Sequence, residues 1–211
     1  MKLSIQAISN GPWKQNCYVV ADVDTKKSFI VDPGSEAKKI QKFIDEEGLD
    51  PIAIVNTHGH FDHVGAVDSL MKTYQIPFFL SGDDAKLLKQ ANIYKILFEV
   101  KDPITIPQIT TSIGVEDRKL SVGPFEIIVI ATPGHTKGSV CLIIENEMFS
   151  GDTIFSNQLG RTDLPGGSAE SLLQSADVLR DLDGSLNVWP GHGKSFTLKN
   201  LWANLDKKCN R

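Results

Sequence analysis

A cluster of histidines in the first third of the sequence carries its clearest chemical signal. His58, His60, Asp62 and His63 form one H-x-H-x-D-H run within six residues. In an extended segment, residues two apart point to the same side, so His58 and His60 can face one ion. Asp62 and His63 come at the turn into an expected helix and can be aimed at a second ion. Three imidazoles and a carboxylate at this density have no use in packing, so the run predicts a metal site.

The two remaining histidines and one further aspartate occur in loops of the same kind. His135, Asp152 and His192 each follow a glycine, and each lies just after a short apolar run. Loops that leave the ends of buried strands are where α/β proteins gather functional residues. No cysteine stands in these loops, which argues against a structural zinc knuckle. We expect two divalent ions, zinc in the first place and iron or manganese as alternatives. Their predicted ligands are His58, His60, Asp62, His63, His135, Asp152 and His192.

Patterns of apolar residues place these motifs between strands and helices. Short β-branched or apolar runs predict strands over residues 2–8, 16–21, 28–31, 51–55, 77–80, 125–131, 140–144, 147–150 and 187–189. Helical spacing predicts helices over residues 35–47, 62–74, 83–90, 168–182 and 198–205. Residues 92–113 have no clean period and are interpreted as a lid-like or surface segment. This order favours an α/β layered sandwich with functional loops at one edge of the sheets.

Composition limits the partners that such a site can serve. The formal net charge is −4, so nothing indicates nucleic acid, an anionic membrane or a protein as a partner. No signal-peptide core and no run of ~18 apolar residues is present. The three cysteines are an odd number and lie far apart, so we expect no disulfide framework and a cytoplasmic location. We expect one domain over residues 1–211 that acts on a small-molecule substrate.

The motifs together resemble those of the metallo-β-lactamase superfamily. The run Thr57-His58-Gly59-His60-Phe61-Asp62-His63 resembles the signature of that superfamily. The segments Asp32-Pro33-Gly34, Pro133-Gly134-His135-Thr136, Ser150-Gly151-Asp152-Thr153 and Gly191-His192-Gly193 resemble its other motifs, in the same order. The resemblance implies a four-layer αββα sandwich with the metal site at one edge.

Two further segments are similar to short bacterial hydrolases of the glyoxalase II-like branch. These segments are Asn16-Cys17-Tyr18 and residues 159–167. The resemblance implies that one ion is bound by His58, His60 and His135, and the other by Asp62, His63 and His192. It implies that Asp152 bridges the two ions and that Asp32 bonds the loop carrying the histidines.

The reaction that this branch implies is thioester hydrolysis. A hydroxide held between two ions would attack the carbonyl carbon of an S-lactoylglutathione-like substrate, with Asp62 and Asp152 as catalytic residues. True glyoxalase II binds glutathione through a long C-terminal extension, whereas 19 residues follow His192 here. The identity of the thiol half of the substrate therefore stays open. Metallo-β-lactamases proper usually carry cysteine at the position of Asp152, so antibiotic hydrolysis is not expected.

Other members of the superfamily supply the alternatives. A glutathione persulfide dioxygenase would use one iron, held here by His58, His135 and Asp152. A lactonase would use the same ligands as the thioesterase. A flavodiiron-type oxidase has glutamate where His60 stands, and an RNA-processing nuclease does not suit an acidic chain. A non-enzymatic binding module is disfavoured because no ligand is missing.

Three residues outside the metal motifs are candidates for substrate contacts or for ordinary structure. Arg161 either binds a substrate carboxylate or pairs with Asp163. Phe155 either lines the pocket or belongs to the core. Trp13 lies in an early loop, residues 10–15, which in a fold of this kind can reach over the site but which we interpret as ordinary surface.

Overall fold

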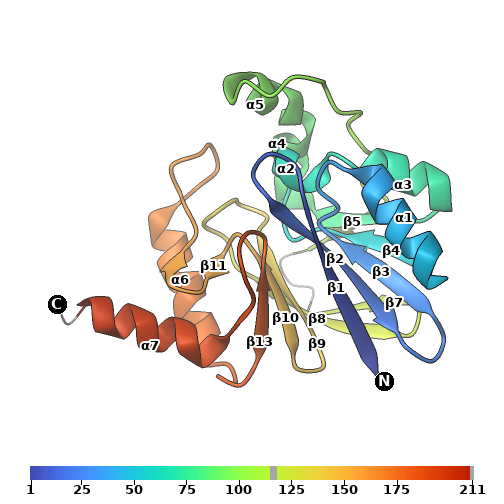
Figure 1. Ribbon diagram of the computed structural model, residues 1–211. Coiled ribbons are helices and arrows are strands. Elements are labelled where there is room, and N and C mark those ends of the chain that lie inside the picture. Colours follow the sequence, from blue (N-terminus) through green and yellow to red (C-terminus); the bar gives the residue numbers. More distant parts are fainter. Residues whose placement is uncertain (115–117, 210–211) are drawn as a thin grey trace.

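Two six-stranded sheets form the centre of the computed structural model, which describes residues 1–114 and 118–209 (Figure 1). The first sheet contains, in spatial order, β1 (Leu3–Asn10), β2 (Gln15–Asp22), β3 (Lys27–Val31), β4 (Asp50–Val55), β5 (Phe78–Ser81) and β6 (Thr111–Ile113). The second contains β14 (Phe196–Thr197), β13 (Asn187–Pro190), β10 (Glu147–Gly151), β9 (Val140–Ile144), β8 (Phe125–Ala131) and β7 (Lys119–Val122). A separate pair is formed by β11 (Ile154–Phe155) and β12 (Gln158–Leu159).

Helices cover the outer faces of both sheets, as Figure 1 shows for α1 and α3 on one side and α6 and α7 on the other. The helices are α1 (Ala37–Glu47), α2 (Phe61–Val64), α3 (Val67–Tyr74), α4 (Ala85–Lys89), α5 (Ala91–Leu97), α6 (Ala169–Arg180) and α7 (Leu198–Cys209), with a short 3-10 turn η1 (Gly82–Asp84).

Alternation along the central strands produces the four layers. In β3, Ile30 packs toward the helices of the first layer, whereas Phe29 faces the second sheet. Phe29 meets Phe125 of β8 edge to face, with ring centroids 5.0 Å apart. In β9, Leu142 joins this inter-sheet core and Cys141 packs toward α6 and α7. Successive side chains of a strand point to opposite faces, so one strand serves two cores. The predicted αββα sandwich is confirmed.

Strand direction brings the motif-bearing loops to one edge. β3 and β4 are parallel neighbours, so Asp32 and the loop beginning at Thr57 leave the first sheet on the same side. β8 and β10 both run antiparallel to β9, and β13 is parallel to β10. The loops with His135, Asp152 and His192 therefore leave the second sheet at a common edge as well.

The helix predicted over residues 62–74 is interrupted in the structure. α2 ends at Val64 and α3 begins at Val67. The break lies where the carbonyl of Gly34 accepts a hydrogen bond from the N–H of Ala66 at 2.6 Å. A Cβ on Gly65 would lie 2.9 Å from that carbonyl oxygen, so glycine allows the approach. The sequence pattern continued across the break because Val64 and Val67 are both buried.

Residues 92–113 contain structure that the sequence did not predict. Most of α5 lies in this segment, irregular chain follows it, and β6 pairs in parallel with β5. The pattern of α5 was unreadable because Ile93, Ile96 and Leu97 are 56%, 75% and 69% exposed, which leaves the helix without a single apolar face. The short strands β7, β11, β12 and β14 were also missed.

Among the described residues, no helix is long and apolar enough to cross a membrane.

Candidate metal centre

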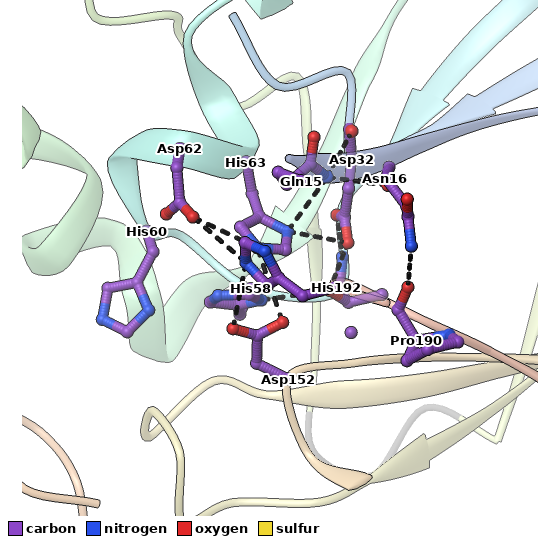
Figure 2. A network of polar contacts seen from close by, with 12 residues as sticks. Gln15, Asn16, Asp32, His58, His60, Asp62, His63, Asp152, Pro190 and His192 are labelled. Atoms are coloured by element: carbon purple, nitrogen blue, oxygen red, sulfur yellow. Dashed lines mark hydrogen bonds and ion pairs between the residues drawn. The ribbon is translucent and has the colours of Figure 1, made fainter. Parts of the chain in front are cut away.

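The loops at the shared edge bring six of the seven predicted ligands into two adjoining groups of three. Figure 2 shows how His58, His60, Asp62, His63, Asp152 and His192 lie in this region. In one group, ligand atoms of His58, His60 and His135 all lie within 4.8 Å of one another. In the other, the same holds for the three residues Asp62, His63 and His192. The division matches the one that the sequence motifs implied.

Asp152 lies between these two groups. Its Oδ2 is 3.7 Å from His135 Nε2 in the first group and 3.6 Å from His192 Nε2 in the second. Its Oδ1 is 3.6 Å from His63 Nε2. These distances are longer than a hydrogen bond, but they suit ligand atoms that bind a common cation. A carboxylate in this position is suited to contact both ions.

Unpartnered buried atoms test whether a metal fits here. His58 Nε2, His63 Nε2 and Asp152 Oδ1 are buried and have no hydrogen-bond partner in the described part of the chain. A buried polar atom without a partner is costly, so such atoms ordinarily have a bonding role. All three are imidazole nitrogens or carboxylate oxygens, which are ligands for divalent transition metals. The residues therefore fit divalent metal ions.

Asp32 positions the histidine loop, as the resemblance implied. Its Oδ1 accepts a hydrogen bond from the N–H of Thr57 at 2.8 Å, and its Oδ2 accepts one from the Thr57 hydroxyl at 2.6 Å. The same Oδ2 lies 3.1 Å from His63 Nδ1. A carboxylate on one ring nitrogen orients the other, so His63 Nε2 is directed into the site. Ligand atoms of Asp32, His58 and His63 also lie close together, but both Asp32 oxygens are already engaged.

A second carboxylate, which sequence reasoning missed, supports the other group. Asp84 is buried, and its Oδ2 accepts hydrogen bonds from the Gly59 N–H and the Thr136 hydroxyl, each at 2.8 Å. Its Oδ1 accepts one from the Gly138 N–H at 2.8 Å. Asp84 therefore ties the His58–His60 loop to the His135 loop. Its sequence context, two adjacent aspartates before a helix, resembles an ordinary N-terminal cap and gave no signal of this role.

Glycine is required where the loops meet most closely. A Cβ on Gly138 would lie 2.8 Å from Asp84 Cγ. A Cβ on Gly191 would lie 2.7 Å from His63 Cε1 and would also collide with Asp152 Oδ1. The absence of a side chain at these two positions lets the loops approach each other around the ligands.

The His192 loop is held from the opposite sheet. The amide of Asn16 donates to the carbonyls of Pro190 at 3.1 Å and Gly193 at 2.8 Å (Figure 2). The hydroxyl of Tyr18 donates to the same Pro190 carbonyl at 2.6 Å. His192 Nδ1 lies 3.1 Å from the carbonyl oxygen of Trp13. These contacts explain why strand β2 carries polar residues at its start.

Electrostatics distinguish the two groups. Burial and the neighbouring imidazoles hold the pKa of His58 well below its usual value, and burial and His135 lower the pKa of His60 to about 3. Burial also disfavours charge on His63, but the carboxylates of Asp62, Asp32 and Asp152 outweigh it and raise the His63 pKa to about 10. His58 and His60 are therefore neutral at pH 7, whereas His63 carries a proton.

A cavity of about 500 Å³ opens onto these ligands. Its wall includes the predicted pocket residue Phe155 and the ring of Trp13, together with Tyr94 of α5 and Phe98, which directly follows that helix. Trp13 packs edge to face against Phe61 and Phe98, with centroids 5.1 Å and 6.3 Å away. Trp13 therefore lines the cavity, as expected if its loop reaches over the site, although 38% of the residue is exposed.

Arg161 lies on the wall of the same cavity and is paired with Asp163. Its Nε and Nη2 donate to the two carboxylate oxygens of Asp163, both at 2.7 Å. Its backbone carbonyl lies 2.8 Å from His135 Nδ1, a contact that fixes the ring of this proposed ligand. No sequence pattern indicates this backbone role. The role of the guanidinium in substrate binding stays a prediction.

Comparison with known proteins agrees with this geometry. A family model described as "Metallo-beta-lactamase superfamily" matches residues 10–192. The "Probable metallo-hydrolase YqgX" of Bacillus subtilis (strain 168) is 37% identical over 186 residues, which is 87% of this chain and 87% of that protein.

Two solved structures are similar over nearly their full length. The structure titled "BLEG-1 B3 metallo-beta-lactamase" has a TM-score of 0.86 and 35% identity, and the match covers 93% of this chain and 95% of that one. "TTHA1623 in a di-iron-bound form" has a TM-score of 0.83 and 32% identity, covering 92% and 96%.

Proposed function

We propose that this chain, which belongs to the metallo-beta-lactamase superfamily, is a hydrolase that depends on two divalent metal ions. The observation that carries the proposal is the position of Asp152 between two groups of three ligands, with unpartnered nitrogens on His58 and His63. His58, His60 and His135 would hold one ion, Asp62, His63 and His192 the other, and Asp152 both. When bound, two such ions supply a hydroxide at neutral pH and polarise a carbonyl oxygen.

The residues of the chain then position the reactants. Asp62 lines the cavity, and its Oδ2 lies 3.3 Å from His192 Nε2. Although burial opposes it, His63 and His192 hold the pKa of Asp62 below its usual range. A carboxylate that stays ionised is suited to orient the attacking oxygen by accepting a hydrogen bond, rather than to keep its proton.

We assign a thioester as the preferred substrate. The residues around the ligands resemble the glyoxalase II-like branch, and a thiolate is a good leaving group that needs little help from a general acid. The wall formed by Trp13, Phe98 and Phe155 offers apolar surface to the group attached to the scissile bond. Zinc is the preferred metal, because histidine and aspartate oxygen suit it and no redox step is required.

A β-lactam is the second candidate substrate. BLEG-1, which is 35% identical over almost the whole chain, is titled a B3 metallo-beta-lactamase. That similarity runs against the expectation drawn from the absence of cysteine at Asp152, so a β-lactam belongs in the test. Both substrates present a carbonyl carbon to the same site.

The test is a substrate panel with purified protein of known metal content. S-lactoylglutathione, nitrocefin, an acyl-homoserine lactone and glutathione persulfide are assayed side by side, with oxygen uptake recorded for the last. We expect turnover of the thioester above the other substrates, and loss of turnover in Asp152→Ala. Oxygen uptake with one iron per chain would overturn the assignment in favour of a persulfide dioxygenase. Preferential turnover of nitrocefin would replace the thioester with the β-lactam.

A further inference from the structure

We propose that Lys95 binds an anionic group of the substrate, in a second cavity beside the metal centre. The inference rests on the proposed hydrolase function and adds a substrate class to it: a carbonyl compound that carries a carboxylate at a distance from the scissile bond. It is carried by an unpaired buried lysine and by the wall that the two cavities share.

The burial of Lys95 is unusual for this chain. The residue is only 7% exposed, whereas every other lysine whose side chain the structure describes is exposed. No ion pair or hydrogen bond of its ammonium group is found within residues 1–114 and 118–209. The stem of the side chain is buried, whereas its Nζ keeps contact with solvent, so a bound anion would replace water around the ammonium group. A position like this fits an external anion.

The surroundings of Lys95 provide room for that anion. A cavity of about 420 Å³ is lined by Lys95 from α5 and by residues 100–105, which follow that helix. Asn10, Ser35 and Thr105 add polar groups to the lining. The lysine is therefore directed at space that a ligand can enter, rather than at a packed interior.

The second cavity adjoins the first along a common wall. Trp13, Phe61 and Asp62 line both cavities. Asp62 belongs to the proposed metal centre, so a molecule whose carbonyl lies at the ligands can extend to either side of the Trp13 ring. One side would take the acyl group and the other the leaving group.

Charge separates the roles of the two cavities. In the first cavity, the guanidinium of Arg161 is already bonded through two nitrogens to Asp163. The ammonium of Lys95 in the second cavity has no such partner. A carboxylate therefore gains more at Lys95, and the aromatic part of the first cavity, which includes Phe98 and Phe155, suits an uncharged acyl group.

The experiment compares carboxylates with amides of equal shape. Acetyl thioesters of 3-mercaptopropionate, 6-mercaptohexanoate and 11-mercaptoundecanoate are assayed beside the corresponding primary amides. We expect the wild-type protein to prefer the carboxylate at one chain length. Lys95→Met should lower kcat/KM for that carboxylate by about 10- to 100-fold, the scale of a lost charge-assisted hydrogen bond, mainly through KM. The amide should be unaffected, and Lys95→Arg should keep the preference.

Lys101→Met is the matched control, because Lys101 lines the same cavity but is exposed. Its effect on the carboxylate should be much smaller than that of Lys95→Met. Thermal unfolding of each variant shows whether it is folded. If Lys95→Met does not fold, Lys95→Gln and Lys95→Arg are compared instead.

A binding measurement separates this inference from the proposed reaction. Calorimetry follows 6-(ethylthio)hexanoate, which cannot be hydrolysed, and its amide. Binding of the carboxylate to the wild type but not to Lys95→Met supports the anion site even if no thioester is turned over. Equal binding of carboxylate and amide, or equal loss in the Lys95 and Lys101 variants, overturns it.

Discussion

The carboxylate of Asp84 accepts a hydrogen bond from the N–H of Gly59 at 2.8 Å, directly between the proposed ligands His58 and His60. The same side chain bonds Gly138 in the loop that follows His135. One buried carboxylate thus fixes the relative positions of two loops from different sheets. Asp32 accepts a hydrogen bond from the Thr57 N–H and lies beside His63 Nδ1, so it fixes the loop that carries both residues. The two aspartates support different halves of the site.

Replacing Asp84 should weaken one half of the site selectively. Asp84→Asn replaces one carboxylate oxygen by an NH2 group, so either the Gly138 N–H or the Gly59 N–H and the Thr136 hydroxyl lose their acceptor, and we expect a loss of about 2–4 kcal/mol in the free energy of unfolding. Affinity for the ion at His58, His60 and His135 should fall about 10- to 100-fold. Chemical denaturation and metal competition titrations measure these effects. Asp83→Asn is the control, since Asp83 is exposed. Equal effects of the two substitutions would contradict the proposed role.

Asp32→Asn should weaken metal binding in the other half of the site. The asparagine keeps the volume but loses the charge beside His63 Nδ1, so the ion at Asp62, His63 and His192 should bind about 10- to 100-fold more weakly. The ion in the other group should change little. Stepwise titration with cobalt, followed by its absorption bands, resolves the two events. Weakening of both ions to the same extent would mean that the two groups are not separate sites.

Proton release should differ between the two ions. Asp62, Asp32 and Asp152 raise the pKa of His63 to about 10, overcoming the opposite effect of burial, so this ring is protonated at pH 7 in the metal-free protein. It must lose the proton to bind an ion, and affinity at this position should rise with pH up to about 10. The pKa of His60 is about 3, so its ring has no such proton to lose.

Calorimetry in two buffers of different ionisation enthalpy measures the protons released by each binding event. We expect at least one proton for the ion bound by His63 and none from His58 or His60. The same pH dependence for both ions between pH 6 and pH 8 would count against this assignment of the ligands.

The ion pair between Arg161 and Asp163 should determine whether the first cavity contains a free positive charge. Both side chains are more than half exposed, at 53% and 67%, so breaking the pair should change stability by less than ~1 kcal/mol. Asp163→Asn frees the guanidinium and should raise kcat/KM for thioesters whose acyl group carries a carboxylate. Arg161→Met should leave metal content unchanged, because His135 contacts only the backbone carbonyl of Arg161. Loss of metal in Arg161→Met would show that the side chain supports the site.

The ligands were predictable because their signal is local. His58, His60, Asp62 and His63 lie within six residues, and the other ligands follow strand patterns that are readable one at a time. The layered fold followed from the alternation of strands and helices. Boundaries were less accurate, as the break between α2 and α3 depends on a contact with Gly34, far away in the sequence.

The supporting residues were not predictable, because their roles depend on contacts between distant segments. Asp84 acts on loops 25 and 54 residues away, and its own neighbours look like a helix cap. Trp13 lies at the site with its ring against Phe98, which directly follows the unpredicted helix α5. Lys95 lies on that same helix, which has no readable apolar face.

The number of metal ions per chain tests the central claim most directly. Purified protein is freed of loosely bound metal by gel filtration and analysed for zinc, iron and manganese against protein concentration. We predict two ions per chain in the wild type and a loss of both in Asp152→Ala, because Asp152 lies between the two ligand groups. One ion per chain after saturation, or two ions retained without Asp152, would contradict the two-metal site.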